Sequence, residues 1–161
     1  VGEEGIGDTW NDIESVIDET QLREIEKKLA SYPNELERIC QTDAFVVLNE
    51  KAESGKEKWE EFQYSIKEGK EASIEIIKFT DEGDAIITHV YYNGLCYYVV
   101  EDSTRDTFGN GEICQKKFLY MHLLERDGLT EVILSDEEIM DTELLSSLDT
   151  SIHYLVHYWN D

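Results

Sequence analysis

The stretch from Ser73 to Asp102 constrains the fold more than any other part of the chain. It holds three apolar runs, SIEIIKFT, AIITHVYY and LCYYVVED, which are separated first by DEGD and then by Asn93-Gly94. Runs of this length, rich in β-branched and aromatic residues, form strands, and Asn-Gly between two such runs is typical of a two-residue hairpin turn. The sequence therefore predicts a three-stranded antiparallel meander.

Further strands are expected before and after the meander. AFVVLN (44–49) is apolar and β-branched, which indicates a buried strand. FLYMHLLE (118–125) and LTEVILS (129–135) are separated by Arg126-Asp127-Gly128 and predict a second hairpin. The final SIHYLVHYW (151–159) has too many aromatic and β-branched residues for a helix, so we expect a strand there.

Helical periodicity is clearest before the meander. TQLREIEKKLAS (20–31) has apolar residues at helical spacing and is followed by Pro33, which predicts a helix that ends there. A short helix is expected over 34–42, with Asn34 as N-cap and Glu37 completing a capping box. KEKWEEFQYSIKEGKE (56–71) predicts a third helix, which Gly69 stops, and its apolar face is made by Trp59, Phe62 and Ile66.

Two further helices are predicted nearer the ends of the chain. One is short and rests on the spacing of Trp10, Ile13 and Ile17. The other begins at Ser135, which is expected to cap it with Glu138 three residues on, and its apolar stripe is made by Ile139, Leu144, Leu145 and Leu148.

Together these elements predict an α+β fold in a single domain spanning residues 1–161. We expect a mainly antiparallel sheet of about five to seven strands with the helices packed on one face. Residues 1–42 would form a helical N-terminal part with a flexible acidic lead, 43–113 a strand, a helix and the meander, and 114–161 a hairpin, a helix and a terminal strand. A chain of 161 residues suits one domain with a sizeable core.

The charge of the chain limits its partners. It has 37 Asp and Glu against 14 Lys and Arg, and its formal net charge is −23. Such a charge repels nucleic acids and anionic lipid surfaces, so no nucleic acid is expected as a partner. Solubility is the favoured explanation of the acidity, and docking on a basic protein partner is the alternative.

Cysteine usage and the start of the chain give only limited information. Cys40, Cys96 and Cys114 are odd in number and form no C-x-x-C pair, so we interpret them as small apolar residues, with one disulfide left open. No apolar run is long enough to span a membrane. Because the chain opens on Val1 and the acidic VGEEGIGD, we expect a processed product and a leaning toward export.

The segment EDSTRDTFGNGEI (101–113) looks most like a functional loop. A calcium loop starting at Asp102 would need ligands at positions where Thr104 and Ile113 stand, and a phosphate-binding loop would need a lysine after its last glycine. Both interpretations fail. The favoured one is a turn in which Asp102, Ser103 and Thr104 bond nearby backbone and Arg105 pairs with a neighbouring acid.

Two other groups of residues are candidate sites. His153 and His157 would lie on the same face of a strand, but no third zinc ligand is near them in sequence, so neither a metal nor a cofactor is predicted. The tyrosine pairs 91–92 and 97–98 would place one ring each on an exposed sheet face, where Tyr92 and Tyr98 could anchor a protein partner. The alternative is that one tyrosine of each pair is in the core and the other shields the sheet.

The residues from Phe79 to Gly109 resemble a bacterial domain of unknown function found in short, often lipid-anchored envelope proteins. The loop of that family reads D-[NS]-T-R-D-x-F-G, and Ser103 stands where Asn is usual. The resemblance covers residues 43–113 and implies a strand, a helix and a meander, a leaning toward the envelope, and no reaction. The matching positions are Gly83, Asp84, Gly94, Asp102, Thr104, Arg105, Asp106, Phe108 and Gly109.

These observations leave three functional hypotheses. The first is a non-enzymatic binding domain of the cell envelope, lipid-anchored through a removed N-terminal segment, with candidate binding residues Asp102, Thr104, Arg105, Asp106, Tyr92 and Tyr98. The second is a cytosolic acidic inhibitor or immunity protein that binds a basic toxin or nuclease. The third, least favoured, is a hydrolase that uses Arg105 with Asp102 or Asp106.

Overall fold

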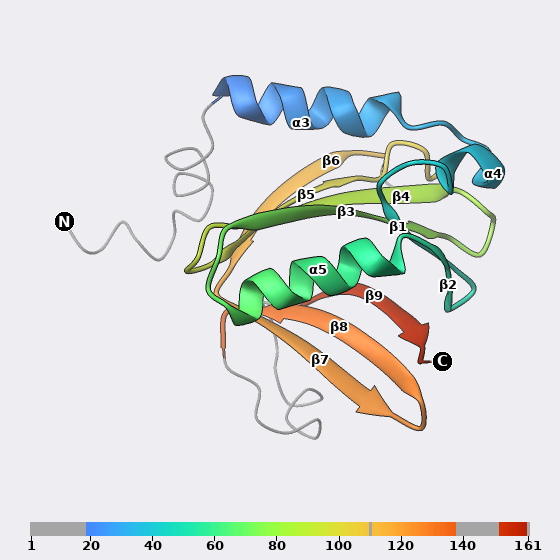
Figure 1. Ribbon diagram of the computed structural model, residues 1–161. Helices are drawn as coiled ribbons and strands as arrows, with labels where there is room; N and C mark the ends of the chain where they lie inside the picture. The colour runs from blue at the N-terminus through green and yellow to red at the C-terminus, as the bar shows by residue number, and fades with distance from the viewer. Residues whose placement is uncertain (1–18, 110, 138–151, 161) are drawn as a thin grey trace.

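The computed structural model describes residues 19–109, 111–137 and 152–160 (Figure 1). The helices in these ranges are α3 (Glu19–Ser31), α4 (Leu36–Ile39) and α5 (Lys56–Lys67). The strands are β1 (Phe45–Leu48), β2 (Lys51–Ser54), β3 (Ala72–Phe79), β4 (Ala85–Tyr92), β5 (Tyr97–Asp102), β6 (Ile113–Phe118), β7 (Tyr120–Arg126), β8 (Leu129–Ser135) and β9 (Ile152–Trp159). The helices predicted around Trp10 and after Ser135, and the acidic lead, lie outside the described residues.

The predicted meander forms the centre of the larger sheet. Among the described residues, six strands pair in the order β2-β1-β3-β4-β5-β6. Strands β3, β4 and β5 are antiparallel neighbours, as predicted, and β1 pairs with β3 in parallel. Parallel neighbours need a crossover, and α5 lies in the connection between β1 and β3. The fold is α+β with mainly antiparallel strands, which confirms the predicted class.

A second sheet takes the strands that follow. β8 lies between β7 and β9, and both pairs are antiparallel. The prediction of one strand over 118–125 was wrong in its first residues, because the chain passes from one sheet to the other there. Phe118 ends β6 in the first sheet and Tyr120 begins β7 in the second, with Leu119 between them. Strands that turn such a corner join packed sheets and show no break in their apolar pattern.

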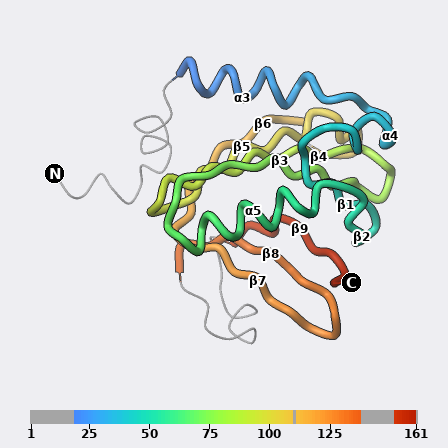
Figure 2. The backbone as a smooth tube through the Cα atoms, in the orientation of Figure 1, coloured from blue at the N-terminus to red at the C-terminus, as the bar shows by residue number. Residues whose placement is uncertain are grey.

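The larger sheet is covered on both faces. α3 lies over one face, while α5 and the second sheet lie under the other (Figures 1 and 2). Alternation along the strands supplies both cores: Ile74, Ile76 and Val90 pack with Trp59 and Phe62 of α5, whereas the opposite face packs with Leu29 of α3 through Ile77, Ile87 and Val100. The expectation that the helices pack on one face is therefore not confirmed.

The start of the second helix also differs from its prediction. α4 covers only Leu36–Ile39, and its N-cap is Glu35, whose side chain makes no capping hydrogen bond. Asn34 therefore lies one residue too early to act as the N-cap, and the capping box with Glu37 does not form. The stop of α5 was predicted correctly, since Gly69 follows it with φ +71°.

Gly55 joins β2 to α5 and lies close against the backbone of Ala44. Its φ is +78°, and a Cβ there would lie 2.0 Å from the carbonyl oxygen of Ala44. Gly69 has a similar φ of +71°, but a Cβ there would meet nothing within 4 Å. The two glycines therefore separate the cost of left-handed backbone from the cost of a steric clash.

We predict that Gly55→Ala lowers the free energy of unfolding by about 3 kcal/mol or more, because strain and a backbone clash add. Gly69→Ala, the matched control, should cost only about 1 kcal/mol, the cost of the left-handed conformation alone. Urea denaturation of both variants measures the difference. Equal losses would contradict the close approach of Gly55 to Ala44.

Candidate functional site

The 101–113 loop is held by its own side chains. The Asp102 carboxylate is buried and accepts hydrogen bonds from the backbone N–H of Thr104 at 2.8 Å and from its hydroxyl at 2.6 Å. The Asp106 carboxylate accepts the backbone N–H of Phe108 at 3.1 Å. These contacts confirm the predicted turn, in which short polar side chains bond backbone groups two residues on.

Arg105 caps the C-terminal end of α3, a role that the sequence did not indicate. Its predicted pairing with a neighbouring acid was wrong: the guanidinium donates to main-chain carbonyl oxygens at and just beyond the end of α3. The contacts are 2.7 Å to Tyr32, 3.1 Å to Pro33, and 3.3 Å each to Leu29 and Ala30. The last carbonyls of a helix lack intrahelical partners and carry partial negative charge, so a cation there both caps and stabilises it.

The same loop is tied to the first turn of the meander. Asp84 Oδ2 accepts hydrogen bonds from the backbone N–H and the hydroxyl of Thr107, both at 3.0 Å. Most of the residues that carry the family resemblance thus form one clamp between the β3–β4 turn, the loop and α3. Two lie outside it: Gly94, in the β4–β5 turn, and Phe108, with 78% of its surface exposed.

Tyr92 and Tyr98 do not form the exposed pair that the alternation along the strands predicts. Tyr92 and Tyr98 are buried, at 8% and 3% exposure, and the Tyr92 hydroxyl donates to the Gly94 carbonyl oxygen. Tyr91 is only partly buried and lines a pocket. Binding through Tyr92, Tyr98 or the loop residues stays a prediction.

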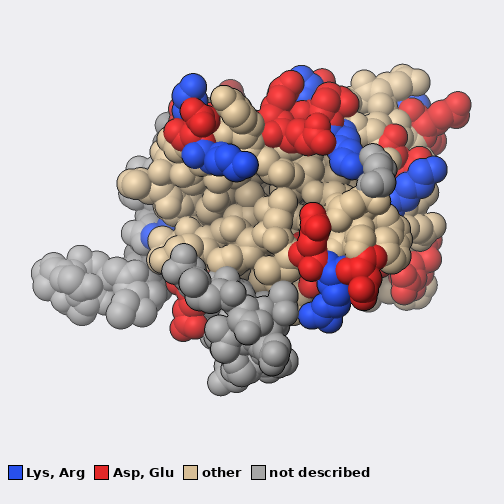
Figure 3. Space-filling model, turned by 60° about the horizontal axis from the view of Figure 1, so that its bottom comes forward, with Lys and Arg blue, Asp and Glu red and all other residues tan. Residues whose placement is uncertain are grey.

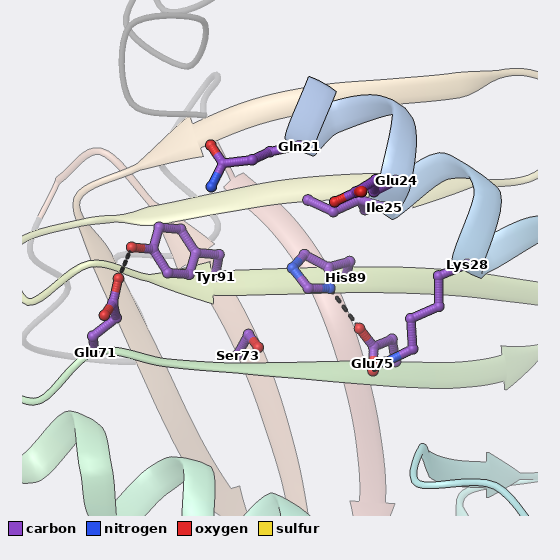
Figure 4. Close-up of a pocket in the computed structure, with 9 residues that line it drawn as sticks. All are labelled: Gln21, Glu24, Ile25, Lys28, Glu71, Ser73, Glu75, His89 and Tyr91. Carbon is purple, nitrogen blue, oxygen red and sulfur yellow. Dashed lines mark hydrogen bonds and ion pairs between the residues drawn. The ribbon is translucent and has the colours of Figure 1, made fainter. Parts of the chain in front are cut away.

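That pocket is the candidate functional site. It lies between α3 and the strands β3 and β4, with a volume of about 390 Å³, and we call it the α3 pocket (Figure 4). The helix provides one wall and the sheet the floor. Its lining residues are Gln21, Glu24, Ile25, Lys28, Glu71, Ser73, Glu75, His89 and Tyr91.

A buried carboxylate and imidazole stand at one end of the α3 pocket. Glu75 on β3 and His89 on β4 face each other across the strand pair, and Oε2 of Glu75 lies 2.6 Å from Nδ1 of His89. Lys28 of α3 donates to Oε1 of Glu75 at 3.0 Å. Burial by itself would raise the pKa of Glu75, but the hydrogen bonds and charges of His89 and Lys28 outweigh it and lower that pKa.

The other end of the α3 pocket is formed by Glu71 and Tyr91. The Tyr91 hydroxyl donates to Oε2 of Glu71, just before β3. This hydrogen bond, with burial and the nearby negative charge adding to it, raises the pKa of the Tyr91 phenol to about 12. Tyr91 is therefore a neutral hydrogen-bond donor at any physiological pH.

A second ionic cluster joins the two sheets. Oε2 of Glu101 accepts the Thr88 hydroxyl at 3.0 Å and lies 3.5 Å from Nε2 of His153 on β9. Burial would raise the pKa of Glu101, but His153, Lys78 and Thr88 lower it to about 2. His157 instead lies 3.1 Å from Glu50, so the two histidines contact different carboxylates and form no zinc pair.

Three further features expected from the sequence concern metal ligands, the cysteines and membrane spans. Within the described part of the chain, no three His, Cys, Asp or Glu side chains gather as a metal site. Cys40, Cys96 and Cys114 are all free thiols, of which only Cys96 is buried. No helix in the described ranges is long and apolar enough to cross a membrane.

The α3 pocket was not predicted from the sequence, although the sequence contains a signal for it. Glu75 and His89 each interrupt an otherwise apolar strand, SIEIIKF and AIITHVYY. A charged residue in a strand buried on both faces needs a partner, and the register of two adjacent strands can supply one.

We predict that Arg105→Ala loosens α3 by removing its cap, at a cost of about 2 kcal/mol. Hydrogen exchange should accelerate at the amides of α3 while those of β3, β4 and β5 stay protected. Arg38→Ala is the control, because that arginine has 70% of its side chain exposed and, among the described residues, forms an ion pair only with Glu35. Equal acceleration throughout the sheet would contradict a local role for Arg105.

We also predict a pH dependence from Glu101. Its folded-state pKa of about 2 lies below the ordinary 4.5, so its stabilising contribution is complete above pH 4.5 and declines as the pH falls toward 2. Glu101→Gln should cost about 2 kcal/mol at pH 7, and less as the pH falls through that window. Denaturant unfolding across the window measures this, and Glu57→Gln, on the exposed side of α5, should show no such trend.

Comparison with known proteins places the chain in a family. No curated protein and no solved structure matches it. Residues 43–132 match the family described as a domain of unknown function (DUF4362). The matched range includes β1 to β7, α5 and the 101–113 loop, and α3 lies outside it. The match spans more than half of the chain, so this protein belongs to the DUF4362 family.

Proposed function

We propose that this protein is a non-enzymatic binding domain of the bacterial cell envelope, and that the α3 pocket is where its ligand binds. The observation that carries the proposal is a pocket of about 390 Å³ with fixed polar groups on its floor. Pockets of this size, with a few placed polar groups, are typical of small-molecule sites.

The floor of the α3 pocket is organised before any ligand arrives. Lys28 and His89 both hold the Glu75 carboxylate, and the strand register fixes Glu75 opposite His89. Side chains that are already held lose little conformational freedom on binding, which favours affinity.

The groups in the α3 pocket suit binding better than catalysis. The Tyr91 phenol, with a pKa of about 12, is a poor general acid or base at neutral pH. The other hydroxyl in the lining, that of Ser73, stands on the same strand face as Glu75, two residues away. The resemblance of the loop residues to envelope proteins favours an exported location.

A second candidate function, the inhibitor of a basic protein, is favoured by the net charge of −23. Figure 3 supports it less, because the acidic side chains on that face stand in separate groups around a wide area without charges. A docking surface for a basic protein would be expected to present one continuous acidic patch. Dispersed carboxylates fit the interpretation based on solubility.

The proposal is tested by nuclear magnetic resonance with isotope-labelled protein and a panel of small probes of different charge. The panel is 1,4-diaminobutane, 1,4-butanediol, succinate, lysine and glucose, each at millimolar concentration. We expect at least one probe to shift the amide signals of β3, β4 and α3 around the α3 pocket, and Ser73→Leu, which fills the pocket, to abolish the shifts.

The matched control is Gln41→Leu, which introduces the same side chain at an exposed position outside the α3 pocket and should leave the shifts unchanged. If no probe shifts the pocket signals, the proposed function is wrong. A basic nuclease that binds tightly and is released by salt would support the inhibitor instead.

A further inference from the structure

We infer that the ligand of the α3 pocket carries a protonated amine. This inference rests on the proposed function and adds the chemical class of the ligand. It follows from how the charged groups in the pocket are paired, from one unused ring nitrogen, and from the surfaces beside them.

The positive charge in the α3 pocket is already bound to a carboxylate. Lys28 Nζ lies 3.0 Å from Oε1 of Glu75, and it is the only lysine or arginine among the described residues that line the pocket. An anionic ligand would have to compete with Glu75 for that ammonium. Breaking a partly buried ion pair to admit another anion is costly, so an anionic ligand is disfavoured.

The negative charge in the α3 pocket exceeds the positive. Glu24 on α3 and Glu71 before β3 have no Lys, Arg or His partner within ion-pair distance among the described residues. Figure 4 shows Glu24 on the helix and Glu71 at the start of β3, on the sheet side of the pocket. A cation between them would interact with both carboxylates, and the charge of the whole protein would attract it from solution.

His89 adds an observation that acidic residues alone would not give. The residue is 9% exposed, and its Nδ1 is bonded to Glu75. The other ring nitrogen, Nε2, has no hydrogen-bond partner among the described residues, and Figure 4 shows it turned away from Glu75 toward the Tyr91 side of the pocket. In the neutral imidazole that donates Nδ1–H to Glu75, Nε2 is an acceptor.

These groups form a set of acceptors that matches an ammonium. A protonated amine has three N–H donors and no acceptor. Nε2 of a neutral His89 ring and the carboxylate of Glu71 are acceptors on the floor, and Glu24 is a third on the helix. Ile25 and the ring of Tyr91 give apolar surface for an alkyl chain, so an aliphatic amine suits the α3 pocket.

The test uses three probes that share a four-carbon chain and differ in their end groups: 1,4-diaminobutane, 1,4-butanediol and succinate. Calorimetry and amide shifts on the full chain, at fixed ionic strength, measure affinity and location. We expect the diamine to shift the pocket signals and the diol and the diacid to bind at least about tenfold more weakly, since each lacks charge-assisted hydrogen bonds to the carboxylates.

Two variants separate the site from the general acidity of the chain. Glu71→Gln should weaken diamine binding about tenfold, because it removes a charge while keeping an acceptor for Tyr91. Glu57→Gln, with the same loss of charge on α5 beyond the opposite sheet face, should weaken it less than about twofold. Both positions are exposed, so both variants are expected to fold.

Each other outcome has a defined meaning. If succinate or the diol shifts the pocket signals as strongly as the diamine, the amine is wrong and the binding function stands. If both variants weaken the diamine equally, the binding is diffuse attraction to an acidic protein, and the inference is wrong. If none of these three probes shifts the pocket signals, the inference is wrong, and if lysine and glucose also leave them unchanged, the proposed function is wrong as well.

Discussion

The burial of the central meander on both faces is the constraint on which the rest of the fold depends. β3, β4 and β5 have a helix above them and a helix and a second sheet below, so each strand must be apolar at consecutive positions. Polar residues on such strands need partners. The pair Glu75–His89 spans β3 and β4, the pair Thr88–Glu101 spans β4 and β5, and the two pairs lie on opposite faces of the sheet. The α3 pocket exists because the first of these pairs lies where the helix covers the sheet incompletely.

The position of α3 is decided by a residue far from it in sequence. Arg105 lies within the part of the chain that matches the DUF4362 family, whereas α3 lies outside that part. Four carbonyl oxygens at the end of the helix and just beyond it nevertheless accept hydrogen bonds from the Arg105 guanidinium. Two further contacts hold the same helix on the sheet. Lys28 donates a hydrogen bond to Glu75, and Leu29 packs in the core between α3 and the sheet. The family residues thus hold a wall of the α3 pocket that the family match does not itself include.

The fold was predictable where local pattern and tertiary packing agree. The three runs of the meander, the helix of α5 and the terminal strand β9 were found from periodicity and turn residues. β2 was missed because its turn is Asn49-Glu50, both with positive φ, rather than the Asn-Gly that signals a hairpin. β6, ICQKKF, has only one buried residue and lies at the sheet edge, so it shows no apolar alternation. The role of Arg105 could not be predicted, because carbonyl acceptors leave no trace in the side-chain sequence.

Docking of α3 on the sheet and binding of a ligand in the α3 pocket are thermodynamically linked. A ligand that contacts Glu24 on α3 together with Glu71 and His89 on the sheet binds only when the helix is docked. It must then stabilise the docked helix by as much as docking favours the ligand, because coupling free energies are reciprocal. Weakening the Arg105 cap would therefore lower ligand affinity although Arg105 is not part of the α3 pocket. In this way the contacts between Arg105 and α3 affect ligand affinity at a pocket that they do not line. Conversely, ligand binding would stabilise the contacts between the 101–113 loop and α3.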